Sequence, residues 1–193
     1  MKSRSLQWLV LLAICFLCTE APAQTNELSF AVGAYTTSHV HLKNDQMFAL
    51  QGAVAHRFLN LHKASLLVEL PIAASFDNRA KATAILQGQF FATRHYAAIF
   101  IAPGVQLKLF PDSRISPYFM IGAGLAHFSK TGGSSSTNTN VVDFGGGIDV
   151  RLTHRFALRS EVRDFYSGPP QLITGLLDRE HQIIATGGVV FRF

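Results

Sequence analysis

The stretch His181–Phe193, HQIIATGGVVFRF, decides the fold class of this chain through its strict alternation of residue types. One alternate set of positions is apolar or glycine, and the other carries the polar side chains of Gln182, Thr186 and Arg192. A period of two residues is typical of a β-strand, and two unlike faces mean that the strand separates two unlike environments. We therefore predict a β-sheet whose two faces meet different surroundings.

The same alternation recurs along the chain, so that eight strands are predicted. They are Glu27–Thr37, Met47–Phe58, Ala64–Ala74, Tyr96–Phe110, Ile115–Phe128, Val141–Leu152, Phe156–Tyr166 and His181–Phe193. Short connections alternate with longer ones such as Ser75–His95 and Ser129–Asn140, as in barrels with short periplasmic turns and longer external loops. The predicted fold is an all-β, eight-stranded antiparallel up-and-down transmembrane barrel, which closes when the last strand pairs with the first.

The two faces of the predicted strands differ in charge. One face is aliphatic and aromatic without interruption, as lipid requires, because an arginine on the lipid face at the bilayer midplane costs about 2–4 kcal/mol. The other face supplies candidates for ion pairs in the lumen, which are Glu69, Lys108, Asp149, Arg151, Arg159, Glu161, Arg163 and Arg192. In a narrow barrel these charges must satisfy one another, because an unpaired buried charge is strongly destabilising.

The segment Thr153–Arg155 allows a register to be predicted for the two strands that flank it. A tight turn there places Asp149 opposite Arg159 as an interior ion pair. It also places glycines opposite long charged side chains, which leaves room for those side chains in the lumen. The pairs concerned are Gly147 with Glu161 and Gly145 with Arg163.

Aromatic residues gather near the strand ends, and we expect them to form belts at the two membrane interfaces. The periplasmic belt is Phe58, Phe110, Phe156 and Phe193; the external belt is Tyr35, Phe48, Phe76, Tyr96, Phe128, Phe165 and Tyr166. The position of Tyr35 in the alternation nevertheless points inward. Pro71 and Pro103 fall inside strands, where each removes a ladder hydrogen bond, and we expect a bulge at each.

The N-terminal residues have the pattern of a secretory signal. Lys2 and Arg4 precede the apolar run Leu6–Cys18, and Ala21-Pro22-Ala23 offers a cleavage site. The apolar run is shorter than the ~20 residues of a membrane-spanning helix. We predict a signal peptide over residues 1–23 and a barrel domain over residues 24–193. Both cysteines lie in the signal, so the barrel is expected to hold without disulfides.

Charge and histidine content argue against several classes of function. The net charge of +5 is modest and scattered, with no basic stripe or reader motif, so nucleic acid is not an expected partner. His39 and His41 share a strand face, but two ligands fall short of the four of a structural zinc site. No metal or other cofactor is expected.

Three segments together resemble the OmpA/OmpX-type eight-stranded outer-membrane barrels: Ser116–Ala126, Phe144–Glu161 and Ala185–Phe193. They combine a glycine-rich strand, a short turn, a strand bearing arginine and glutamate, and an aromatic ending. The resemblance implies a monomer in the outer membrane of a Gram-negative bacterium, in contact with outer-membrane lipids and lipopolysaccharide. It also implies that the barrel assembly machinery recognises the last strand, through Gly187, Val189, Phe191 and Phe193.

Such barrels include membrane tethers, adhesion and resistance proteins, and enzymes, so the resemblance leaves the task open. We expect a non-enzymatic barrel with a side-chain-filled lumen, acting in envelope integrity or surface interaction through its extracellular loops. One alternative is a lipid A deacylase-like enzyme, in which His127 would activate Ser129. Its orienting carboxylate would be Asp143, which the alternation points inward. A small-solute pore is the second alternative.

Overall fold

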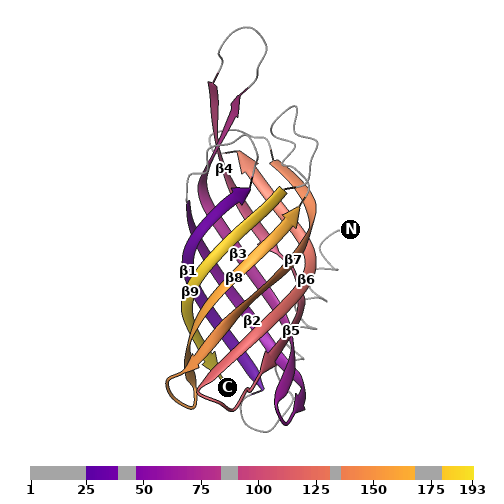
Figure 1. Ribbon diagram of the computed structural model, residues 1–193. Coiled ribbons are helices and arrows are strands. Elements are labelled where there is room, and N and C mark those ends of the chain that lie inside the picture. Colours follow the sequence, from indigo (N-terminus) through magenta and orange to yellow (C-terminus); the bar gives the residue numbers. More distant parts are fainter. Residues whose placement is uncertain (1–24, 39–46, 84–90, 131–135, 168–179) are drawn as a thin grey trace, which may run out of the picture.

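Nine β-strands make up almost all of the chain that the computed structural model describes, which is residues 25–38, 47–83, 91–130, 136–167 and 180–193 (Figure 1). They are β1 (Asn26–Ser38), β2 (Met47–Leu61), β3 (Ala64–Thr83), β4 (Phe91–Ile101), β5 (Gly104–Leu109), β6 (Ile115–Lys130), β7 (Ser136–Arg151), β8 (Phe156–Ser167) and β9 (Glu180–Arg192). The predicted signal peptide, His39 and His41 lie outside the described residues. None of the described residues belongs to a helix long and apolar enough to span a membrane.

All neighbouring strands pair antiparallel, and the sheet closes on itself where β9 pairs with β1. The closing ladder runs from Glu27–Arg192 to Ser38–His181, and Asn26 and Phe193 exchange backbone hydrogen bonds of 2.9 and 3.0 Å beyond its end. β4 and β5 follow each other along one strand of the wall, because both pair with β3 on one side and β6 on the other. The predicted eight-stranded antiparallel barrel is therefore confirmed.

The alternation predicted from sequence separates the two sides of the wall. In β6, Ile121 is 64% exposed on the outside, whereas the neighbouring Met120 is 6% exposed in the lumen. The exposed outer residues are aliphatic and aromatic, while the buried inner residues include nine charged side chains, among them Glu27, Arg159 and Arg163. An apolar outside and a charged inside are the reverse of a soluble barrel, and this arrangement suits a wall surrounded by lipid.

The bulges expected at Pro71 and Pro103 are not found in the described strands. The β2–β3 register passes through the Ala53–Pro71 pair without a shift. β3 pairs in the same register with β4, which ends at Ile101, and with β5, which begins at Gly104. The register therefore does not shift at Pro103. Both prolines thus lie at the same level of one seam, so a single interruption of the ladder accommodates both missing N–H groups.

Two connections are shorter than predicted, because strands continue into them. β3 pairs with β2 only as far as Ser75, and β4 pairs with β6 only from Tyr96 onward. Beyond these points β3 and β4 pair with each other up to Thr83–Phe91, as a ribbon that rises above the barrel (Figure 1). The sequence of this ribbon lacks the unbroken apolar alternation of a lipid-facing strand, so a search for that alternation does not detect it.

The connection predicted over Ser129–Asn140 is shortened in the same way. β6 and β7 remain paired up to Ser129–Ser136, so strand pairing covers most of that segment. The described residues Ser136–Asn140 of β7 are serine, threonine and asparagine, so this part of the strand has no apolar side by which the sequence could have predicted it.

The external aromatic belt is partly wrong, because Phe128 and Phe165 are fully buried inside the barrel. Phe165 stacks on Phe100 with ring centroids 4.7 Å apart, and Phe128 meets Phe100 edge-on at 5.9 Å. Tyr35 also points inward, as its alternation predicts, with its ring 6.2 Å from that of Phe100. Nearness to a strand end located these rings along the barrel axis, but it did not decide which face they occupy. The four periplasmic-belt phenylalanines are exposed as predicted.

Candidate functional site

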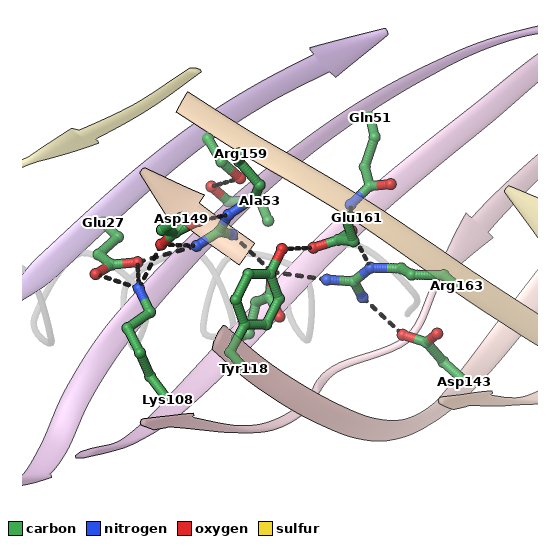
Figure 2. Close-up of polar contacts among 12 residues, drawn as sticks. Glu27, Gln51, Ala53, Lys108, Tyr118, Asp143, Asp149, Arg159, Glu161 and Arg163 are labelled. Carbon is green, nitrogen blue, oxygen red and sulfur yellow. Dashed lines mark hydrogen bonds and ion pairs between the residues drawn. The ribbon is translucent and has the colours of Figure 1, made fainter. Parts of the chain in front are cut away.

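Charged side chains from most strands of the wall meet in the lumen (Figure 2). Their positions follow from the inward half of each strand's alternation, and none of them is more than 5% exposed. The set is Glu27, Glu69, Lys108, Asp143, Asp149, Arg159, Glu161, Arg163 and Arg192, with Tyr118 between them. They form two clusters that share the same space.

The first cluster is built around two carboxylates, Glu27 and Asp149. Lys108 Nζ donates to both oxygens of Glu27 at 2.7 and 2.5 Å and lies 2.8 Å from Asp149 Oδ2. Arg159 holds Asp149 through Nε and Nη2 at 2.8 and 3.0 Å, and its Nη2 also reaches Glu27 at 3.2 Å. Arg192 Nε lies 3.3 Å from Glu27. Three cations thus surround two anions, and the cluster carries an excess of positive charge.

The second cluster has the opposite excess. Arg163 donates Nε to Glu161 at 2.5 Å, Nη1 to Asp143 at 2.7 Å and Nη2 to Glu69 at 2.8 Å. One guanidinium therefore serves three carboxylates, each through a charge-assisted hydrogen bond. Gln51 donates a further hydrogen bond to Glu161. The negative excess here offsets the positive excess of the first cluster, and Arg159 Nη1 lies 3.9 Å from Glu69 between them.

Tyr118 joins the two clusters. Its hydroxyl donates to Glu161 Oε2 at 2.5 Å, while its ring lies 4.6 Å from the guanidinium carbon of Arg159 and 5.9 Å from Lys108 Nζ. A ring with cations over its face and an anion at its hydroxyl gains from both contacts, since the π-face attracts cations. Figure 2 shows the ring lying between the Lys108 side and the Arg163 side of the network.

These contacts tie together strands that are not neighbours in the wall. Lys108 of β5 reaches Glu27 of β1, and Arg163 of β8 reaches Glu69 of β3. Side chains that extend from opposite sides of the barrel and contact each other fill the cross-section of the lumen. The rings of Phe100, Phe128 and Phe165 occupy it at a second level. The network neutralises charge and fills space, as expected of an eight-stranded barrel.

The predicted register around Thr153–Arg155 is the one observed, with Asp149 paired to Arg159. Among the other candidates, Arg151 lies apart from the network: it is half-buried at the end of the barrel that is predicted to be periplasmic, and it donates to the carbonyl of Pro111. The remaining candidates, Glu69, Lys108, Glu161, Arg163 and Arg192, lie within the two clusters.

Three members of the network, Glu27, Asp143 and Tyr118, were not among the lumen candidates predicted from the sequence. Asp143 was considered only as a carboxylate of the enzyme alternative, although its inward position in the alternation was recognised. Glu27 lies two residues before the inward Ser29, so its position in the alternation could have identified it. Tyr118 pairs with Gly147 across the β6–β7 ladder, and a large residue opposite a glycine could have been the signal.

The residues proposed for the enzyme alternative lie on opposite sides of the barrel wall. His127 faces outward with Nδ1 2.6 Å from Asn138 Oδ1, whereas Asp143 is buried in the lumen and held by Arg163. The structure therefore gives His127 an amide neighbour, and it does not bring Asp143 to the same face. Within the described residues, no group of three or more histidines, cysteines and acids is arranged to hold a metal ion.

Comparison with known proteins gives similarity of structure without similarity of sequence. No protein-family model and no curated protein sequence matches the chain. Neisserial surface protein A matches with a TM-score of 0.62 and 12% identity, over 90% of this chain and 100% of that one. OprG of Pseudomonas aeruginosa matches with a TM-score of 0.58 and 12% identity, over 89% and 97%. Ail of Yersinia pestis matches with a TM-score of 0.53 and 17% identity, over 87% and 99%.

At these identities the likeness is one of fold. The chain has the fold of the OmpA/OmpX-type eight-stranded outer-membrane barrels. Its closed sheet, apolar outside and charged lumen are what such a barrel needs in a bilayer, so the protein belongs in the bacterial outer membrane.

Proposed function

We propose that this protein is a non-conducting outer-membrane barrel that presents its β3–β4 ribbon for contact with anionic polymers at the cell surface. The ribbon consists of residues 78–83 of β3 and 91–96 of β4. The observation that carries the proposal is that these strands pair with each other well beyond the wall of the barrel (Figure 1). After a register shift between Ser75 and Asn78, the ladder runs without interruption from Asn78–Tyr96 to Thr83–Phe91, and a paired hairpin of this kind supports a contact surface.

The composition of the ribbon supports an anionic partner. Residues 78–83 and 91–96 contain Arg79, Lys81 and Arg94 and no carboxylate. Asp77 directly precedes them, and the segment still carries a net positive charge. The register places Arg79 opposite His95, so basic residue types are concentrated within a few ladder pairs. Such a concentration of cations attracts polyanions over about a Debye length, which is ~8 Å at physiological salt.

The lumen supports a role at the surface over one in transport. Ion pairs that cross the barrel and a cluster of stacked rings fill the space through which a solute would pass. Among the similar folds, Ail has a crystal structure in complex with the heparin analogue sucrose octasulfate, at a TM-score of 0.53 and 14% identity to this chain. A barrel of this size can thus present a site for a sulfated sugar.

Retention on immobilised heparin tests the proposal, with neutral dextran as the reference matrix. Purified barrel should be retained on heparin and released by salt, because exposed charge interactions are screened. The variant Arg79→Gln/Lys81→Gln/Arg94→Gln should pass through. Lys63→Gln/Arg155→Gln, which removes cations at the other end of the barrel, should be retained like the wild type. Equal retention of the ribbon variant and the wild type would overturn the proposal.

A deletion strain separates surface contact from envelope integrity. If the ribbon variant restores normal resistance to detergent and antibiotics in that strain but not attachment to sulfated surfaces, the ribbon acts in contact, as proposed. The opposite result has three parts: the deletion weakens the envelope, the ribbon variant restores it fully, and attachment is the same in every strain. In that case the barrel wall is the functional part and the proposal is wrong.

A further inference from the structure

Two arginines face each other at the periplasmic end of the β6–β7 seam. Arg151 donates its backbone N–H to the carbonyl of Arg114 at 2.8 Å, one step beyond the Ile115–Val150 ladder pair. Like charges directly opposite on neighbouring strands are destabilising. The arrangement therefore calls for an anion that offsets the repulsion.

The described residues do not supply that anion. The lumen carboxylates are held by Lys108, Arg159 and Arg163, and the nearby Asp112 makes no ion pair with either arginine within the described part of the chain. Arg151 donates a hydrogen bond from Nη2 to the carbonyl of Pro111. Its Nε is a buried donor that has no hydrogen-bond partner among the described residues. An unpartnered buried donor beside a second exposed guanidinium favours a ligand with anionic oxygens.

The two arginines line an open groove of about 540 Å³, together with Leu152, Thr153 and His154. Arg114 and His154 are exposed, so their donors can reach a bound group. Thr153 Oγ1 accepts hydrogen bonds from the backbone N–H groups of Arg155 and Phe156 at 3.3 and 3.1 Å, which leaves its hydroxyl hydrogen to donate. Every polar side chain in the groove can therefore donate to an anion.

The groove lies at the edge of the lipid-facing surface. Leu152, which lines it, is 57% exposed, and Ile115 and Phe156 beside it are also exposed apolar residues. A ligand that fits both parts is amphiphilic, with an anionic head for the arginines and hydrocarbon for these side chains. In this position the surrounding medium itself contains such a molecule, which is a phospholipid of the periplasmic leaflet.

We propose that this groove binds the phosphate-bearing headgroup of an anionic phospholipid, with its acyl chains along Leu152 and the neighbouring apolar residues. The lipid phosphate offsets the repulsion between Arg114 and Arg151 and accepts the hydrogen bonds that they have to give. The site thereby couples the stability of this end of the barrel to the lipid composition of the inner leaflet.

Native mass spectrometry of the barrel in mixed micelles tests the proposal, with phosphatidylglycerol compared against phosphatidylcholine. Wild type should retain phosphatidylglycerol preferentially. Arg114→Gln/Arg151→Gln should retain about thirtyfold less, the loss expected from removing two cation–phosphate attractions. Lys63→Gln/Arg155→Gln removes as much charge from the same end but outside the groove, and should behave as wild type. Equal retention by all three proteins overturns the proposal.

Thermal unfolding adds a readout whose sign depends on the lipid. In neutral micelles Arg114→Gln, which changes an exposed side chain, should unfold at a higher temperature than wild type because one of two repelling charges is gone. With phosphatidylglycerol present the order should reverse. The same order in both conditions overturns the proposal.

A competition experiment distinguishes a lipid headgroup from free phosphate. Millimolar inorganic phosphate should leave phosphatidylglycerol retention unchanged, because it makes no apolar contact with Leu152. If inorganic phosphate displaces the lipid fully, the groove is a site for the free anion and the assignment to a lipid is wrong.

Discussion

Tyr118 lies directly opposite Gly147 in the β6–β7 ladder, and a Cβ on Gly147 would lie 2.6 Å from the Tyr118 hydroxyl oxygen. The absent side chain is what allows the tyrosine to cross toward β8, where its hydroxyl donates to Glu161. One glycine in β7 thus determines where the ring that joins the two lumen clusters lies. We therefore expect that adding a single methyl group at Gly147 affects the stability of the barrel.

Gly147→Ala is expected to destabilise the barrel by about 1–3 kcal/mol, because the added Cβ would lie even closer to the Ser160 carbonyl oxygen than to Tyr118, and overpacking destabilises a filled core. Urea unfolding of the refolded protein in micelles measures the loss. Gly52→Ala is the matched control, since an added Cβ there meets its nearest atom at an ordinary 3.7 Å. Equal unfolding midpoints for the two variants would show that both Tyr118 and the Ser160 backbone make room for the added Cβ without cost.

Arg163→Met is expected to cost about 3–5 kcal/mol, because it leaves three carboxylates buried around an apolar side chain. Adding Glu69→Gln to this variant should recover part of the loss by removing one of the unpaired charges. Arg155→Gln, at an exposed turn, should change stability by no more than about 0.5 kcal/mol. A loss for Arg163→Met as small as that of Arg155→Gln would mean that the network contributes little to stability.

Phe100→Ala should destabilise the barrel by about 3–5 kcal/mol, because it removes the ring at the centre of the inner aromatic cluster and leaves a cavity. Phe144→Ala changes a ring of the same size on the lipid face, where acyl chains refill the space. Its effect on the free energy of unfolding should be much smaller. If the outward substitution proves as damaging as the inward one, the cluster does not act as a core.

The wild-type barrel is expected to show no steady ion conductance in planar bilayers, because the Lys108–Glu27 and Arg163–Glu69 contacts cross the lumen. The ribbon variant Arg79→Gln/Lys81→Gln/Arg94→Gln should also show no conductance, since its lumen is unchanged. Regular conductance steps from purified, folded wild-type protein would contradict a filled lumen and favour the small-solute pore.

Phe193→Ala should reduce the yield of folded barrel in the outer membrane while leaving the unfolding of refolded protein nearly unchanged. The substitution keeps the backbone hydrogen bonds between Phe193 and Asn26 and removes only the ring, which stacks on Phe191 with a centroid distance of 5.7 Å. Heat-modifiable migration on a gel measures the folded fraction. Phe58→Ala, another exposed ring at the periplasmic end, should not reduce the yield; an equal reduction would count against an assembly signal in the last strand.

The direction of nearly every side chain in the wall could be predicted from the sequence. Alternation is a local property with a period of two residues, so Ile121 outside and Met120 inside follow from their neighbours alone. The β7–β8 register, with Asp149 opposite Arg159, also followed from the sequence, because the tight turn at Thr153–Arg155 determines the pairing of the strands that it joins.

Only the tertiary structure decided which of the inward charges meet. Lys108 and Glu27 are 81 residues apart, and Arg163 and Glu69 are 94 apart, on strands that share no ladder. Whether such side chains meet depends on the stagger and tilt of all the strands together, which no local pattern contains. For the same reason the alternation could not exclude Arg151 from the network. Arg151 points to the same side of the wall as Asp149, and it stays outside the network because it lies nearer the end of the barrel. The sequence therefore determined which environment each side chain enters, and closure of the sheet decided its partners.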